Sequence, residues 1–183
     1  MQHPEDDHLL MERVARGDAE AFRTLTARHA PSITAHARRM LRDASEAEDM
    51  VQEAFLRLWK NAATYRPEAR LGTFLHRIVH NLCVDALRSR KKTDADALDG
   101  LPSEERPSRE LLVRTRAQRV HDEVGTLPER QRAALSLVHF EGLTNVEAAE
   151  ILQVSVEALE SLLSRARRTL RERLSSLAGE QAG

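Results

Sequence analysis

The most constraining feature of this chain is one apolar stripe near its carboxyl end. In VEALESLLSRARRTLRERLSSL (156–177), apolar side chains recur every three or four residues. This spacing places them on one side of an α-helix and leaves the other side polar. The stripe consists of Leu159, Leu163, Ala166, Leu170, Leu174 and Leu177. An amphipathic helix needs a partner surface, so the stripe predicts a packed helical domain.

Composition extends this prediction to the whole chain. Aromatic residues make up 3% and charged residues 31%, with few glycines and prolines, a mixture that favours helix over sheet. The 183 residues suffice for one ordinary domain or two small ones, and we expect an all-α fold. With a net charge of −1, the chain lacks the general attraction to phosphate of a protein that binds DNA tightly alone. Any DNA binding should be weak, local or assisted.

Localisation signals are also informative. The start MQHPEDDHLL lacks the basic and apolar regions of a signal peptide, and no stretch has the length of a membrane span. Cys83 is the single cysteine, which excludes an internal disulfide. These features predict a cytoplasmic protein without membrane insertion.

Helix signals divide the chain into two helical domains, residues 7–92 and 111–177, joined by residues 93–110. In the first domain, Gly17-Asp18 predicts a helix end and a new N-cap, and Pro31-Ser32 predicts another restart. Ser45 and Glu48 have capping-box spacing, and Thr73 is expected to cap the last helix. The joining segment is acidic and contains Gly100, Pro102 and Pro107, so we expect a flexible linker.

The second domain has the pattern of a helix-turn-helix. Leu127-Pro128-Glu129 predicts a helix start, and 141–144 predicts a helix end followed by a cap. A short helix over 145–153 and a brief turn at 154–155 precede the long amphipathic helix. Its polar side carries Glu157, Glu160, Ser161, Ser164, Arg165, Arg167, Arg168 and Arg171. An ordinary helical hairpin with a solvated basic side fits the spacing equally well.

The acidic start of this long helix has two explanations. Carboxylates in a first turn interact favourably with the positive end of the helix dipole, by about 0.3–1 kcal/mol each. A carboxylate can also accept a hydrogen bond from the amino group of cytosine. Glu157 and Glu160 are therefore candidates for a structural role or for base recognition.

In the first domain, the helix from Ser45 buries one side and presents an unusual other side. Its predicted inward stripe is Val51, Ala54, Phe55, Leu58 and Ala62. The outer side carries Asp49, Gln52, Glu53, Leu56 and Lys60. An apolar leucine among acidic and amide side chains fits a docking surface for a basic partner, although a single exposed leucine is common on protein surfaces.

The next helix and the loop before it carry several cations. Phe74, Ile78 and Leu82 are expected to face inward, and Asp85 to lie near the buried side with a donor partner. Candidate nucleic-acid ligands are Tyr65, Arg66 and Arg70 in the loop and Arg77, Asn81 and Arg88 on the helix. An aromatic ring, an amide and cations can hold an unstacked base and its phosphates. A basic surface with a core-packed tyrosine is equally compatible.

Enzymatic and metal-binding functions have little support. The chain lacks a catalytic triad, a phosphate-binding glycine loop and a carboxylate pair in a catalytic context, so we expect neither an enzyme nor a cofactor. His76, His80 and Cys83 share one helix side at a spacing that can reach a metal ion, but without a fourth ligand we expect a surface cluster.

Three segments resemble the extracytoplasmic-function (ECF) sigma factors of RNA polymerase. GDAEAFRTLTARHAPSITAHARRMLRDASEAEDMVQEAFLRLW (17–59) resembles their regions 2.1 and 2.2, and GTFLHRIVHNLCVDALRSRKK (72–92) resembles regions 2.3 and 2.4. LPERQRAALSLVHFEGLTNVEAAEILQVSVEALESLLSRARRTLRERL (127–174) resembles region 4. The resemblance implies a region 2 helical bundle and a region 4 helix-turn-helix joined by a linker.

The resemblance also implies functions for the candidate residues. Asp49, Gln52, Glu53 and Leu56 would dock on the β′ subunit of core RNA polymerase. The six loop and helix residues from Tyr65 to Arg88 would melt and capture the minus-ten element of promoter DNA. The polar side of the last helix would recognise the minus-thirty-five element, and region 4 would also touch the β subunit. An anti-sigma factor is a further partner implied by the family.

Two departures from the family pattern involve three positions, and one alternative stays open. Glu160 and Leu162 stand where many members have a lysine and an arginine, and Phe74 stands where tryptophan is frequent. The changed helix gives some support to a sigma-like mimic that titrates an anti-sigma factor without initiating transcription. A stand-alone helix-turn-helix regulator would not need the region 2 segments.

Overall fold

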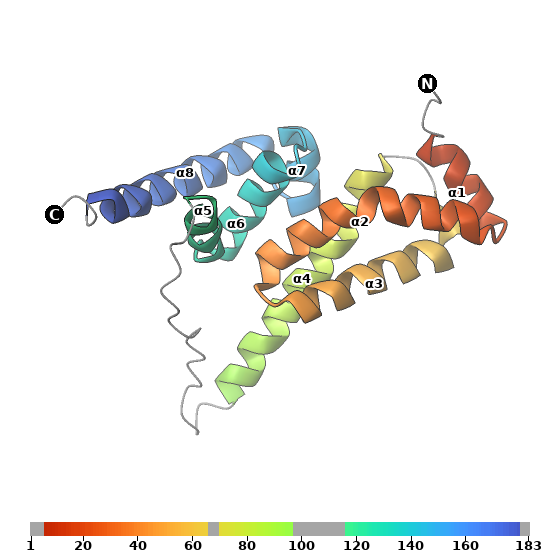
Figure 1. Ribbon diagram of the computed structural model, residues 1–183, viewed down its shortest axis with the longest axis horizontal. Helices are drawn as coiled ribbons and strands as arrows, with labels where there is room; N and C mark the ends of the chain where they lie inside the picture. Colours follow the sequence, from red (N-terminus) through yellow and green to blue (C-terminus); the bar gives the residue numbers. More distant parts are fainter. Residues whose placement is uncertain (1–5, 66–69, 97–115, 180–183) are drawn as a thin grey trace.

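The computed structural model describes residues 6–65, 70–96 and 116–179, and every regular element among them is helical (Figure 1). The all-α prediction is therefore confirmed. The first half contains α1 (Asp7–Ala15), α2 (Ala19–Leu41), α3 (Ala44–Lys60), the short 3₁₀ helix η1 (Ala62–Thr64) and α4 (Leu71–Asp96). The second half contains α5 (Arg116–Gly125), α6 (Glu129–Leu135), the π-helical turn η2 (Ser136–Phe140), α7 (Asn145–Leu152) and α8 (Val156–Gly179).

The boundary between α1 and α2 lies where the sequence predicts it. Gly17 adopts a φ of 87°, and the Asp18 side chain accepts hydrogen bonds from the amides of Glu20 and Ala21 at the start of α2. The predicted restart at Pro31-Ser32 is wrong, because α2 continues through Pro31 to Leu41. Flanking residues Leu25 and Ile33 are fully buried, and this packing offsets the backbone hydrogen bond that proline cannot make.

Two other predicted caps are also wrong. Asp43, not Ser45, caps α3, because its carboxylate accepts from the amide of Glu46 at 2.9 Å. Thr73 lies inside α4, and its hydroxyl donates to Glu147 in α7 at 3.1 Å. Helix α4 extends to Asp96, and residues 97–110 of the predicted linker lie outside the described part of the chain.

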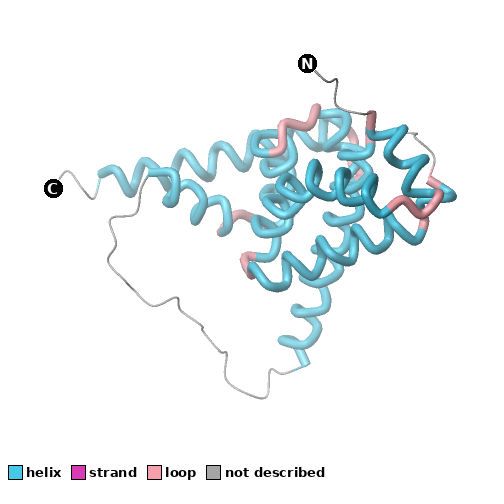
Figure 2. The backbone as a smooth tube through the Cα atoms, turned by 45° about the vertical axis from the view of Figure 1, so that its right-hand side comes forward, coloured by secondary structure: helices cyan, strands magenta, loops and turns pink. Residues whose placement is uncertain are grey.

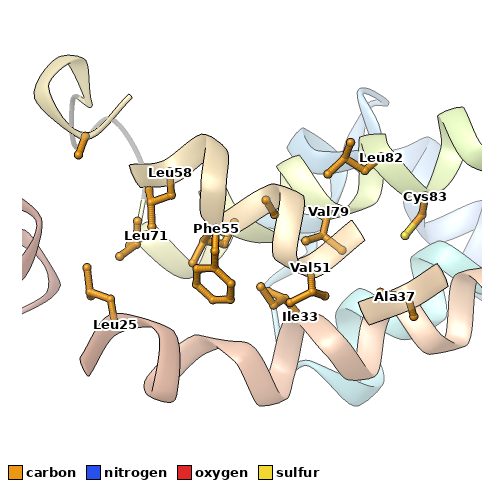
Figure 3. Close-up of a cluster of buried hydrophobic side chains, with 14 of the residues drawn as sticks. Leu25, Ile33, Ala37, Val51, Phe55, Leu58, Leu71, Val79, Leu82 and Cys83 are labelled. Atoms are coloured by element: carbon orange, nitrogen blue, oxygen red, sulfur yellow. The ribbon is translucent and has the colours of Figure 1, made fainter. Parts of the chain in front are cut away.

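The first hydrophobic core lies between α2, α3 and α4 (Figure 3). The predicted inward stripe from Val51 to Ala62 is buried, with its last member in η1 rather than in α3. On α4 the buried line is Leu71, Leu75, Val79 and Leu82, whereas Phe74 and Ile78 are only partly buried at its edge. The inward position predicted for Leu82 is therefore confirmed. For Phe74 and Ile78 the prediction was wrong by one residue, because the neighbouring Leu75 and Val79 occupy the buried line.

A second core holds α5–α8 together. Its fully buried members include Val124, Leu137, Ile151 and Leu159. Thr144 and Glu147 form a capping box at the start of α7, and Gln153 ends α7 in a left-handed conformation with φ of 52°. Helices α7 and α8 therefore form the predicted helix-turn-helix, with Leu159, Leu163 and Ala166 buried on the inner side of α8.

The two halves pack against each other, with α2 and α4 facing α6, η2 and α7 (Figure 2). Neighbouring alanines of α6 belong to different cores. Ala133 packs into the core of the first half, and Ala134 packs into that of the second. Among the described helices, none combines the length and apolar character that a membrane span requires.

Candidate nucleic-acid and polymerase interface

The outer side of α3 is the first candidate surface. Asp49 and Gln52 are exposed, and the Leu56 side chain projects with 51% of its surface accessible. Glu53 is partly buried and forms an ion pair with Arg57 at 2.7 Å. Because the opposite side of α3 is buried in the core, the four predicted docking residues lie together on one accessible helical surface. Their role in docking stays a prediction.

The second candidate surface lies on α4. Asn81 and Arg88 are exposed and line a cleft of about 690 Å³ between α4 and helices α6 and α7. Arg77 forms an ion pair with Glu150 of α7 at 3.5 Å, and its guanidinium lies 5.5 Å from the centre of the Phe74 ring. This part of the predicted minus-ten surface therefore faces acidic side chains of the second half.

The loop before α4 contributes less than the sequence suggested. The Tyr65 ring packs edge-on against Phe74, with 5.3 Å between ring centres. Burial and the nearby Asp7 raise the pKa of the Tyr65 hydroxyl. This arrangement favours the core-packed alternative for Tyr65. Arg70 is exposed, and Arg66 lies outside the described residues.

The environment predicted for Asp85 is wrong. Its side chain is 73% exposed, and its contact with Arg88, at 3.9 Å, lies on the surface. Helix α4 turns this position toward the cleft rather than toward the core, so Asp85 does not require a buried donor.

The third candidate surface is the polar side of α8. Glu157, Glu160 and Arg165 are all exposed, and every other predicted minus-thirty-five residue is exposed as well: Ser161, Ser164, Arg167 and Arg168. The Arg167 guanidinium contacts His139 Nε2 at 2.8 Å. The seven residues lie on one helix, so the structure brings the predicted set together on one accessible side.

The acidic start of α8 also has local structural partners. The pKa of the Glu157 carboxyl is lowered first by a hydrogen bond from the backbone amide of Glu157 itself and then by one from the Ser155 hydroxyl. Glu160 accepts a hydrogen bond from the Asn145 amide of α7 at 3.4 Å. Both carboxylates therefore stabilise the helix-turn-helix, and both remain accessible to a ligand.

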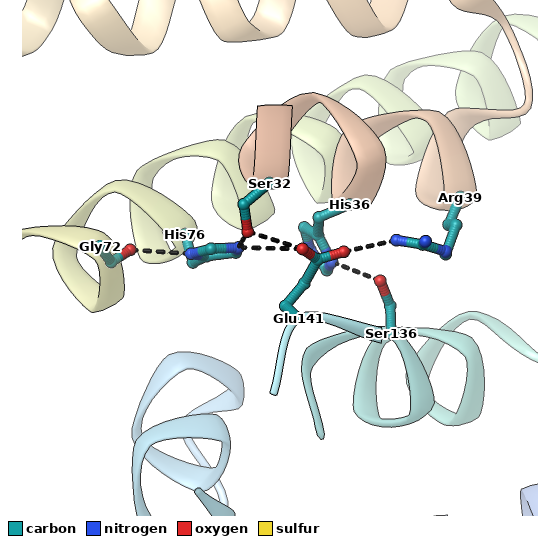
Figure 4. Close-up of polar contacts among 7 residues, drawn as sticks. All are labelled: Ser32, His36, Arg39, Gly72, His76, Ser136 and Glu141. Atoms are coloured by element: carbon teal, nitrogen blue, oxygen red, sulfur yellow. Dashed lines mark hydrogen bonds and ion pairs between the residues drawn. The ribbon is translucent and has the colours of Figure 1, made fainter. Parts of the chain in front are cut away.

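The sequence did not reveal a polar cluster where the two halves meet (Figure 4). Glu141, whose side chain is 5% exposed, accepts a hydrogen bond from Ser32 at 2.6 Å and pairs with Arg39 of α2. His36 contacts the Ser136 hydroxyl at 2.9 Å, and both residues are fully buried. The partners are separated by about a hundred positions in the chain, so no local pattern could link them.

The histidines of α4 belong to this interior, and the predicted surface cluster is wrong. His76 is 4% exposed, His80 is 7% exposed and Cys83 is fully buried. Burial lowers the pKa of His80 to about 4 and raises the pKa of the Cys83 thiol to about 12. No set of three or more histidine, cysteine or acidic side chains within the described ranges could hold a metal ion.

His36 is the most deeply buried of these histidines. Burial, followed by the nearby His80, His76 and Arg39, holds its pKa well below the ordinary value. The ring centres of His36 and His80 lie 5.7 Å apart. The neutral imidazoles thus form part of the packed contact between α2 and α4.

Comparisons with known proteins agree with this architecture. Residues 25–93 match the model of Sigma-70 region 2, and residues 117–170 match Sigma-70, region 4. The chain is 33% identical to the RNA polymerase sigma-H factor of Pseudomonas aeruginosa, covering 96% of this chain and 97% of that protein. It is 32% identical to the ECF RNA polymerase sigma factor SigM of Mycobacterium tuberculosis, covering 92% and 85% respectively.

Solved structures show the same fold. CnrH in complex with the cytosolic domain of CnrY has a TM-score of 0.71 and 26% identity, covering 94% of this chain and 99% of that one. The sigma factor RpoE of Bartonella quintana, bound to the anti-sigma factor NepR, also has a TM-score of 0.71, at 23% identity and with 84% and 96% covered. Matches over both halves, in order and at nearly full length, identify the chain as a member of the ECF sigma factors.

Proposed function

We propose that this sigma factor binds core RNA polymerase and directs it to particular promoters, which it recognises and melts. The observation that carries the proposal is the presence of two separate exposed polar surfaces on α3 and α8, each backed by a buried apolar side. Sigma factors are initiation factors rather than catalysts, so the polymerase performs the chemistry.

The α3 surface is suited to a basic helical partner. Asp49, Gln52 and Glu53 supply carboxylate and amide acceptors, and Leu56 supplies an apolar contact at their edge. The partner would be the β′ subunit of the polymerase. Region 4 would contact the β subunit, so that both halves attach to the same enzyme.

The two DNA surfaces have complementary tasks. On α4, Arg77 and Arg88 would bind phosphates of the displaced minus-ten strand, and Asn81 would contact a base edge. On α8, the exposed arginines Arg165, Arg167 and Arg168 would bind phosphates at the minus-thirty-five element. Glu157, Glu160, Ser161 and Ser164 would face the bases. A net charge of −1 suffices because the polymerase holds the factor on DNA.

An anti-sigma factor is the regulator that we propose for this chain, and the cytoplasm is its expected compartment. The RpoE neighbour was solved with its anti-sigma factor NepR. The anti-sigma factor would cover either the outer side of α3 or the cleft between the two halves. A sigma-like mimic, which would bind the anti-sigma factor but not start transcription, is the second candidate, because Glu157 and Glu160 are accessible on the recognition helix.

Genome-wide transcription in vitro tests both candidates. Purified factor and core polymerase should produce discrete new start sites, and Asp49→Lys or Leu56→Ala should remove most of them. Leu9→Ala is a matched control, because Leu9 is 50% exposed and Leu56 is 51% exposed on different helices. Absence of new starts, together with tight binding to an anti-sigma factor, would favour the mimic.

A further inference from the structure

The cleft between α4 and helices α6 and α7 has the size and the walls of a small-molecule site. Its volume of about 690 Å³ lies within the range of roughly 300–1,000 Å³ that is typical of ligand pockets. Val84 of α4 and Leu152 of α7 contribute partly exposed apolar surface to it. Asn81 of α4 and Gln153, at the end of α7, contribute exposed amide groups. The cleft therefore combines apolar contact with polar groups that can orient a bound molecule.

An unpaired imidazole in the wall of the cleft also indicates a ligand. His80 lines the cleft, is 7% exposed and forms no hydrogen bond with any residue that the structure describes. Its ring is neutral at neutral pH, because burial lowers its pKa to about 4, so the ring carries a single proton. Nδ1 is buried without a partner, and buried N–H groups without an acceptor are rare, so we assign the proton to Nε2. A molecule in the cleft can therefore accept a hydrogen bond from His80 Nε2.

Two arginines on different walls of the cleft can bind an anion. Arg130 of α6 is exposed and has no ion pair with a described residue. Arg88 of α4 pairs on the surface with Asp85, at a long distance of 3.9 Å. The other carboxylate of the cleft belongs to Glu129, which pairs with Lys91 at 3.3 Å. Because guanidinium groups bind phosphate through paired hydrogen bonds, a phosphate between the two arginines would contact both walls.

Together these groups suit a nucleoside phosphate. A nucleobase has apolar faces and a polar edge, and this edge can form hydrogen bonds with the two amides and with His80. Its phosphate is the kind of anion that arginine pairs recognise. A fatty acid would cover the imidazole without giving it a partner, which costs free energy. Inorganic phosphate would occupy only the arginine end and would leave the apolar walls uncovered.

We propose that this cleft binds a nucleoside phosphate, with the base against the apolar walls and His80 and the phosphate between Arg88 and Arg130. Binding itself is independent of the proposed function, because the free factor can be tested without polymerase or a promoter. The consequence of binding rests on the proposed function. Asn81 and Arg88 are also candidate contacts of the displaced minus-ten strand, so a bound nucleotide and that strand would compete for the same two side chains. The factor would then respond directly to a nucleotide.

Isothermal titration calorimetry on the full-length factor measures binding. The probes are AMP, GMP, CMP and UMP, each compared with its own nucleoside and with inorganic phosphate at the same ionic strength. At least one mononucleotide should bind with a Kd of about 10–100 µM, and about tenfold or more tightly than its nucleoside or phosphate alone. Such a difference requires that the base and the phosphate are recognised together.

Variants at the two ends of the cleft locate the site. Arg130→Ala should weaken mononucleotide binding about tenfold, and it should keep the fold because Arg130 is exposed. Arg23→Ala is the matched control, since it removes an exposed arginine of α2 that does not line the cleft. His80→Phe keeps a ring but removes the Nε2–H donor, so it should weaken binding of both the nucleoside and the nucleotide about fivefold. Circular dichroism confirms that each variant stays helical.

Competition tests the consequence of binding. A fluorescent single-stranded minus-ten oligonucleotide, taken from a promoter identified by transcription in vitro, should bind the free factor about threefold or more weakly at saturating mononucleotide. In Arg130→Ala this effect should be lost at the same nucleotide concentration. Equally weak binding of all mononucleotides and of inorganic phosphate, or unchanged binding in both Arg130→Ala and His80→Phe, would overturn the proposed site. Specific nucleotide binding without competition would support the site and contradict the assignment of Asn81 and Arg88 to the minus-ten strand.

Discussion

The two candidate DNA surfaces of this sigma factor differ in what covers them. On α4, Arg77 and Lys91 pair with carboxylates of the second half. On α8, the arginines Arg165 and Arg168 are exposed and have no ion pair with a described residue. Both helices are amphipathic and carry cations on their outer sides. The difference arises from domain packing, which places carboxylates of α6 and α7 beside Lys91 and Arg77, although Asn81 and Arg88 of α4 stay exposed.

The largest expected effect comes from charges placed on either side of α6. Ala134→Glu buries a carboxylate in the core of the second half and should destabilise it by about 3–5 kcal/mol or more, enough to unfold a small domain. Ala133→Glu places the same charge in the contact between the halves, so it should separate them while both stay helical. Circular dichroism and small-angle scattering distinguish the two results. Equal loss of helix in both variants would contradict the division of α6 between two cores.

The second prediction concerns acid sensitivity at the cleft. Because burial lowers the pKa of His80 from 6.5 to about 4, the fold favours the neutral imidazole. This contribution is complete above pH 6.5 and is lost as the pH falls toward 4, by about 2–3 kcal/mol between pH 7 and pH 4.5. Urea unfolding at the two pH values should show a smaller acid effect for His80→Gln.

His8→Gln is the control for the acid experiment, because His8 lies on the surface of α1 with its side chain 51% exposed. It should leave the acid effect of the wild type unchanged. If His80→Gln behaves in the same way, the buried imidazole does not determine the pH dependence.

A smaller effect is expected at the capping box of α7, the helix that covers α4. Thr144→Ala removes the hydroxyl that bonds the Glu147 amide and carboxylate, and it should cost about 1 kcal/mol. The backbone amide of Thr144, followed by its hydroxyl, lowers the pKa of Glu147, so the contribution of this carboxylate is present above pH 4.5 and is lost as the pH falls below that value. Hydrogen exchange of the α7 amides should accelerate in Thr144→Ala. The control Thr24→Ala, at an exposed position of α2, should leave that exchange unchanged.

The smallest effects should come from single arginines on the accessible surface of α8. Arg165→Ala and Arg168→Ala should each leave stability unchanged, weaken promoter binding by the holoenzyme about threefold, and reduce the salt dependence by about one phosphate contact. Arg23→Ala, which changes an exposed arginine of α2, provides the control.

In the free factor, Arg77→Ala should have less effect on DNA binding than in the holoenzyme, because Glu150 already pairs with the Arg77 guanidinium. An equal effect in both would argue that α4 is not covered.

Sequence patterns predicted the helices and their exposed sides well. The inward stripe of α3, the α8 stripe as far as Ala166, and the turn between α7 and α8 follow from periods of three and four residues and from local caps. Further along α8, Leu170 and Leu174 are only partly buried. The errors occurred where several residues could satisfy the same local rule. Asp43 and Ser45 both offer a cap for α3, and Pro31 signals a break that the packing of α2 overrides. Asp85 and the α4 histidines were misplaced by small errors in helix rotation.

The amino-acid sequence by itself determined the all-α fold and the outer sides of α3 and α8, because helical periodicity and capping act over a few residues. The two sigma regions followed from its resemblance to a known family. Only the tertiary structure decided that Glu141 enters the first half and that His36 meets Ser136. It also decided that acids of α6 and α7 lie against α4. These contacts join residues far apart in the chain, and their energies depend on burial that no local pattern encodes.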